Sequence, residues 1–210
     1  MRITEILEGE YMGADPYVQT PAGDYQRDKN KQRIMAPDWQ QKKTALEARC
    51  RAIYNRLVKV ADPKLAQRLS QVKIEVSTSP FGPAYSFTDL ISIDITAFWD
   101  APNDALAFVI GHEMGHIVGN HLHSKSSSAN RQQELDADRY GISLAQKLGY
   151  NKAAVFKFVY SKQDYKRANT PAPNADHPTL DRRFHQAKTL GFELSKAGQD
   201  QLTDLQQTLA

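Results

Sequence analysis

The run His-Glu-Met-Gly-His at residues 112–116 is the feature that most constrains this 210-residue chain, and it lies inside an apolar helical segment. Residues four apart on an α-helix share one face, so His112 and His116 can reach a single metal ion while Glu113 flanks it. Two imidazoles at this spacing are typical of zinc ligands, and the glutamate between them is typical of a general base. The segment therefore predicts half of a hydrolytic metal site on one helix.

A catalytic zinc ion takes a third protein ligand and keeps its fourth position open. A third histidine three residues after Gly119 would stand at position 122, but that residue is Leu122, so this pattern is excluded. On a continuing helix His121 would lie about 180° around the axis from His112. We therefore expect His121 and His123 to be solvent-facing or loop-capping residues.

Glu134, the next glutamate after Glu113, is the candidate for the third ligand and lies on a second predicted helix. It opens the run Glu-Leu-Asp-Ala-Asp at residues 134–138, in which Glu134 and Asp138 share a helical face. Glu134 could bind the metal while Asp138 accepts the second N–H of a ligand imidazole. The alternative for Glu134 is an exposed acid near a helix start, where the helix dipole favours it. Asp136 is expected to be a solvated surface acid.

Two further elements follow in order: Leu-Gly-Tyr-Asn at residues 148–151, and His177-Pro178 with Arg183 after it. The ordered set of four elements resembles the HtpX-like and CAAX-prenyl-protease-related zinc metallopeptidases, a gluzincin family. The resemblance covers the chain from about Ala84 to Leu190. The long hydrophobic segments of that family's integral members are missing, so their substrates cannot be carried over.

The resemblance implies a zinc-dependent endopeptidase that hydrolyses peptide bonds with a zinc-activated water and a glutamate general base. His112, His116 and Glu134 would bind one Zn²⁺ ion, and Glu113 would be the base. Asp138 would orient a ligand from outside the metal's own coordination sphere. Protein or peptide is the implied substrate.

His177 and Arg183 correspond to the last element of that family. His177 would be a catalytic group, either as a donor to the oxyanion or as a latch in the fourth zinc position, and a surface-loop histidine is the alternative. Arg183 would pair with an acid near the site or orient substrate. A solvated arginine on a helix face is the alternative there, and Arg182 competes for the same role.

The segment Phe87–Thr96 alternates apolar and polar side chains, which predicts a half-buried strand. Backbone hydrogen bonds from such a strand would hold a peptide with little sequence selectivity. An ordinary interior strand is the alternative. Because the segment directly precedes the metal-binding helix, we expect it to provide the substrate edge strand through Ile91, Ser92, Ile93 and Asp94.

Composition places limits on location and partners. Hydrophobic residues make up 40% of the chain, mean hydropathy is −0.59, and no stretch approaches the ~20 apolar residues that cross a bilayer. We expect a protein that is not membrane-integral and, without an apolar signal in residues 1–13, a cytoplasmic one. The single cysteine, Cys50, agrees with a reducing compartment and is expected to be a buried packing thiol. A net charge of +3 without a clustered basic face predicts no nucleic-acid binding.

The predicted architecture is an α+β, zincin-like metallopeptidase domain over residues 41–210, preceded by a flexible or wrapped extension over residues 1–40. The domain is mostly helical, with a small antiparallel or mixed sheet whose edge strand borders the cleft. Helices are expected at Gln41–Val60, Lys64–Ser70, Pro102–Asn120 and Arg131–Leu148, with others beyond residue 150, and a strand at Val72–Ser77.

Gly111 and Gly115 are poor helix formers within the metal-binding helix. They indicate close packing on one face of that helix. The close neighbour is either a second helix or the strand and bound substrate, and the sequence leaves both open.

Three rival functions remain at the level of sequence. A gluzincin aminopeptidase would need an element that holds a free amine, and no GxMEN-like run occurs. A regulatory protease that cuts a repressor under stress also bears HExxH. A non-catalytic, zinc-stabilised binding or scaffold module would bind the same metal but would have no use for Glu113.

Overall fold

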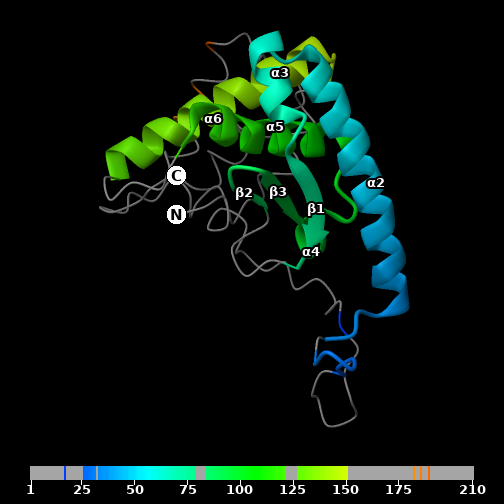
Figure 1. Ribbon diagram of the computed structural model, residues 1–210. Helices are drawn as coiled ribbons and strands as arrows, with labels where there is room; N and C mark the ends of the chain where they lie inside the picture. The colour runs from blue at the N-terminus through cyan, green and yellow to red at the C-terminus, as the bar shows by residue number, and fades with distance from the viewer. Residues whose placement is uncertain are drawn as a thin grey trace, which may run out of the picture.

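The computed structural model describes Tyr17 and residues 26–31, 33–78, 84–121 and 127–150, with residues 182, 185 and 189. Within these residues it contains five helices and one three-stranded mixed sheet (Figure 1). This confirms the predicted mixed α+β class. The helices are α2 (Pro37–Val60), α3 (Pro63–Leu69), α4 (Ile95–Phe98), α5 (Asn103–Gly119) and α6 (Ser127–Lys147), and the strands are β1 (Lys73–Ser77), β2 (Ala84–Ser86) and β3 (Leu90–Asp94).

β3 is the central strand of the sheet, parallel to β1 on one side and antiparallel to β2 on the other. Ser86 pairs with Ile91 and Ala84 pairs with Ile93. Paired residues of antiparallel strands project from the same face of a sheet. Because Ser86 contacts α5, this face, with Ile91 and Ile93, packs against α5.

The prediction of a substrate edge strand in this segment was wrong, because β3 is hydrogen-bonded to a neighbour on both sides. A strand in that position has no free row of backbone groups for a peptide. Among the described residues β2, not β3, is the edge strand beside α5. The misassigned residues, all buried, are Ile91, Ser92, Ile93 and Asp94.

Two local interactions divide the segment that the sequence predicted as one strand. The Phe87 backbone N–H donates to the Leu90 carbonyl at 2.8 Å, which closes a turn between β2 and β3. At the other end, the Asp94 carboxylate accepts from the Thr96 backbone N–H at 2.7 Å and caps α4. Alternation alone gave no sign of either interaction.

α5 is the central helix of the described residues. It packs against α6 on one side and against β2 and β3 on another, and α2 crosses it at a steep inclination (Figure 1). Twelve of its 17 residues are buried, which explains why its sequence is apolar around most of its circumference. None of the described helices is both long and apolar enough to cross a membrane.

Glycines bring the backbones of α5 and α6 into direct contact. A Cβ on Gly111 would lie 2.9 Å from the Cα of Gly141, and one on Gly115 would lie 2.7 Å from the Cα of Ala137. A Cβ on Gly141 would lie 2.7 Å from the backbone nitrogen of His112. Such separations leave no room for a side chain at these three positions. Of the two explanations for Gly111 and Gly115, tight helix packing is therefore confirmed.

The N-terminal boundary of the helical part lies slightly earlier than predicted. α2 begins at Pro37, a residue suited to the first helical turn, so the last residues of the predicted 1–40 extension belong to this helix. Isolated antiparallel bridges join Tyr17 to Met35 and Arg27 to Arg33. The helices predicted beyond residue 150 lie outside the described residues.

Cys50 is fully buried in α2, as predicted for a packing thiol. Burial raises the pKa of its thiol to about 12, which keeps the side chain protonated at neutral pH. A protonated, buried thiol is a poor nucleophile. This agrees with a packing role.

Replacing Gly141 by alanine tests the contact between α5 and α6. In an exposed helix interior this change stabilises by about 1 kcal/mol. At Gly141 we expect the opposite sign, a loss of about 1–3 kcal/mol in the free energy of unfolding, because the new methyl group meets the α5 backbone. Ser143→Ala, at an exposed position of α6, is the matched control for chemical denaturation. A more stable Gly141→Ala protein would contradict the close contact.

Candidate metal centre

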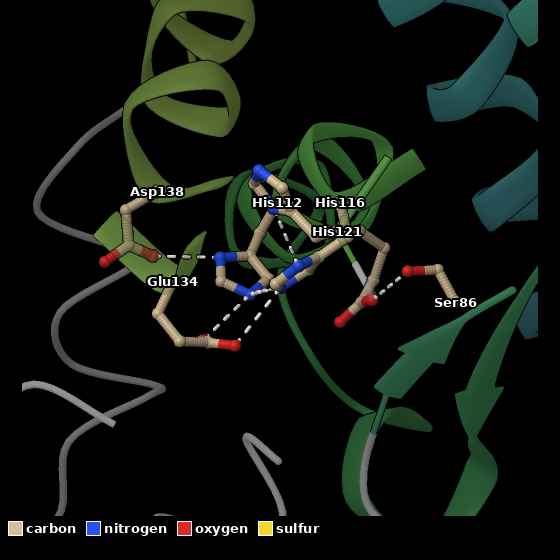
Figure 2. Close-up of polar contacts among 7 residues, drawn as sticks. Ser86, His112, His116, His121, Glu134 and Asp138 are labelled. Carbon is tan, nitrogen blue, oxygen red and sulfur yellow. Dashed lines mark hydrogen bonds and ion pairs between the residues drawn. The ribbon is translucent and has the colours of Figure 1, made fainter. Parts of the chain in front are cut away.

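Three possible ligand groups from two helices converge beside the crossing of α5 and α6 (Figure 2). The Nε2 atoms of His112 and His116 lie 3.0 Å apart. Glu134 of α6 points between the rings, with Oε2 3.4 Å from Nε2 of His112 and Oε1 3.3 Å from Nε2 of His116. The structure thus brings together the three residues that the sequence predicted as metal ligands.

The spacing of these atoms fits a tetrahedral ion. Zinc bonds of about 2.0–2.1 Å to nitrogen and oxygen place neighbouring ligand atoms about 3.3–3.4 Å apart. The three separations of 3.0, 3.3 and 3.4 Å lie close to that value. Two imidazoles and one carboxylate also suit zinc by ligand type, and three protein ligands are typical of a catalytic site.

Asp138 fixes the orientation and tautomer of the His112 ring. Its Oδ1 lies 2.9 Å from Nδ1 of His112, and both side chains are buried. An ionised carboxylate only accepts hydrogen bonds, so Nδ1 must carry the hydrogen and donate it. When the ring is neutral, Nε2 is then the unprotonated nitrogen, and it faces Glu134 and His116, as a metal ligand requires. This is the contact that the spacing of Glu134 and Asp138 predicted.

The electrostatics around His112 favour positive charge. Burial lowers the pKa of this imidazole, but the hydrogen bonds and charges of Asp138 and Glu134 raise it by more, and the result is a pKa of about 10. Two carboxylates that stabilise a proton at this ring also stabilise a divalent cation beside it. The centre therefore suits a cation on charge as well as on geometry.

Ser86, which sequence analysis did not identify, holds the predicted general base. Its hydroxyl donates to Oε2 of Glu113 at 2.8 Å, reaching α5 from strand β2. Glu113 is only 3% exposed, so this hydrogen bond satisfies a buried carboxylate. Ser86 lies 27 residues before Glu113, and no spacing rule connects a short edge strand to a helix at that distance.

The prediction for His121 was wrong, because the helix does not continue to that residue. Asn120 adopts a left-handed conformation with φ 50°, and α5 ends at Gly119. The chain then turns back, and Nδ1 of His121 lies 3.1 Å from Nδ1 of His116 (Figure 2). Burial, and next the neighbouring His116, lower the pKa of the His121 imidazole below its ordinary value. Asparagine after a glycine was the sequence signal for this helix end.

The remaining predicted residues divide into two groups. Asp136 is a surface acid as predicted, 41% exposed and 3.2 Å from the Arg139 guanidinium. His177 and Arg183 lie outside the described residues, and their roles stay predictions.

Among the ligand candidates, His112 is fully buried, while His116 and Glu134 are 18% and 12% exposed. Solvent thus reaches the centre from the side of His116 and Glu134.

Comparison with family models relates the chain to a family of peptidases. The model of the Peptidase U49 family matches residues 92–199, slightly more than half of the chain. The match contains α5 and α6 with all three ligand candidates, whereas Ser86 precedes it. Comparison with curated proteins and with solved structures gives no match. A peptidase family is therefore supported, and the narrower resemblance to HtpX-like enzymes stays a prediction.

The charge balance at His112 predicts proton release on metal binding. With a pKa of about 10 the ring is protonated at pH 7 in protein stripped of metal, and a metal at Nε2 must displace that proton. We expect zinc binding to release about one proton at pH 7 and zinc affinity to rise between pH 6 and pH 8. Calorimetry in two buffers of different ionisation enthalpy measures this release. Identical apparent enthalpies in the two buffers would contradict it.

Proposed function

Because the chain belongs to the peptidase U49 family, we propose that it is a zinc-dependent endopeptidase with a zincin-like arrangement of its site. One Zn²⁺ ion would be held by His112, His116 and Glu134. The observation that supports this most directly is the convergence of the two Nε2 atoms and the Glu134 carboxylate at tetrahedral separations. The substrate would be a protein or peptide, as for any peptidase.

Glu113 is the proposed general base. It follows His112 directly on α5 and is not one of the three residues whose ligand atoms converge. Zinc held there would supply Lewis acidity to the scissile carbonyl and to the attacking water. Glu113 would accept a proton from that water and pass it to the leaving amine. Ser86 donates to Oε2 of Glu113, and because each carboxylate oxygen can accept two hydrogen bonds, this contact orients the base without blocking the transfer.

Strand β2 is the proposed binding edge for the substrate backbone, in place of β3. It is an edge strand among the described residues, and through Ser86 it contacts the base. A peptide added to this edge would be held by backbone hydrogen bonds, which give affinity with little sequence selectivity. A site of this kind favours cleavage within an extended segment of chain, which is endopeptidase activity.

The Glu113→Gln variant tests this function. We expect both this variant and the original protein to bind one zinc ion per chain, and the variant to lose at least about 100-fold in casein hydrolysis, because the amide cannot accept the proton. Elemental analysis and digestion of casein with and without chelator are the measurements, and mass spectrometry of the products separates internal cleavage from stepwise release of amino acids. Full activity in the variant would overturn the enzyme proposal, while zinc without hydrolysis in either protein would indicate a structural site. Release of single residues only would indicate an aminopeptidase.

The Ser86→Ala variant tests the orientation of the base. Removing the hydroxyl leaves Oε2 of the buried Glu113 without this donor, so we expect kcat to fall roughly 10-fold with zinc content unchanged. Ser77→Ala is the matched control, since Ser77 lies in the same sheet but its hydroxyl is 3.0 Å from that of Ser92, away from the centre. Equal kcat in the two variants would contradict a role for Ser86.

A further inference from the structure

We propose that His121 is a positioning residue that holds the His116 ring in the orientation needed for metal binding. The inference rests on the function proposed above and concerns a residue outside the HExxH run. With this role, both ligand imidazoles have a hydrogen-bonding partner on the ring nitrogen that faces away from the metal. Each has its own partner at Nδ1, Asp138 for His112 and His121 for His116.

The backbone at the end of α5 brings His121 to this position. The N–H of Asn120 donates to the carbonyl of Ile117 at 3.2 Å, and the N–H of His121 donates to the carbonyl of His116 at 3.0 Å. With Asn120 in the left-handed conformation, these two bonds form a Schellman motif. In that motif the side chains of the residues corresponding to His121 and His116 commonly make contact. The ring pair follows from how the helix ends.

Gly119 provides the space that the His121 ring occupies. A Cβ at Gly119 would lie 2.7 Å from Cε1 of that ring and closer still to Cδ2 and Nε2. Gly119 does not have a positive φ, unlike Gly149, so alanine could adopt its backbone conformation readily. The obstacle to a side chain at position 119 is thus the His121 ring.

The chemistry of the pair is complete in one tautomeric arrangement. If Nε2 of His116 binds metal, Nδ1 of His116 carries the hydrogen and donates it to Nδ1 of His121 over 3.1 Å. His121 then accepts at Nδ1 and carries its own hydrogen at Nε2. The rings meet nearly edge to face, 80° between their planes and 5.2 Å between centroids, so rotation of the His116 ring would break the hydrogen bond.

The test uses His121→Leu, which removes the acceptor, and His121→Asn, whose side-chain oxygen can take the place of Nδ1. We expect His121→Leu to weaken zinc binding about 10- to 100-fold, the usual effect of removing a partner of a ligand histidine. His121→Asn should restore most of the affinity. Chelator competition measures zinc affinity, and the visible spectrum of the Co²⁺-substituted protein should change in the leucine variant but not in the asparagine variant.

A double-mutant cycle with Gly119 provides an independent arm. Gly119→Ala should weaken zinc binding as His121→Leu does, because the methyl group displaces the ring while leaving its chemistry intact. In a His121→Ala background the same Gly119→Ala change should have no effect on zinc affinity. Thermal unfolding of each variant in chelator separates a metal-dependent role from simple loss of stability.

Three results would overturn the proposal. Unchanged zinc affinity in His121→Leu and Gly119→Ala would show that the contact does not orient His116. A loss of affinity matched by equal destabilisation of the metal-free protein would show a structural role only. A Co²⁺ spectrum that indicates three nitrogen ligands in the original protein and two in His121→Leu would make His121 a ligand itself. If the original chain neither binds zinc nor cleaves casein, the proposed function fails and this inference fails with it.

Discussion

Direct backbone contact between α5 and α6 holds the candidate metal centre together. Gly111 and Gly115 on one helix meet Ala137 and Gly141 on the other without intervening side chains. On α5, His112 and His116 are four residues apart, as are the two glycines beside them. On α6, Glu134 and Asp138 have the same spacing as the two small residues beside them. Glu134 and Asp138 are therefore brought within hydrogen-bonding distance of His112. Larger side chains at the crossing would push the two helices apart and move these carboxylates away from His112.

Burying an imidazole at the centre of the fold requires compensation, and the same crossing supplies it. His112 is completely buried, which by itself disfavours positive charge on the ring. Asp138 and Glu134 reverse that preference from the α6 side. Glu113 is compensated differently, by a neutral hydroxyl from β2. Negative charge is thus concentrated on the side of α5 that faces α6, and the proposed base lies toward the sheet.

Much of the local structure could be predicted from the sequence. The metal-binding helix was placed to within a residue at each end, because its apolar run is long and Pro102 and Asn120 mark its limits. The four-residue spacing within each helix also predicted which side chains the structure would bring together, namely His112, His116, Glu134 and Asp138. The β3 assignment failed because alternation of side chains shows which face of a strand is apolar but does not show whether the polar face is also covered or how many neighbours the strand has. Ser92 is as fully buried as Ile91 and Ile93.

Which side chains share a helical face could be read from residue order alone, because helical periodicity depends only on local backbone geometry. The sequence also contained the signal for the end of α5, in Gly119 and Asn120, which brings His121 back onto His116. Packing between separate elements places β2 beside α5, brings Ser86 to Glu113 and turns Glu134 toward the two imidazoles. These contacts join residues from separate elements, and their distances depend on how closely the backbones approach, which no spacing along one element encodes.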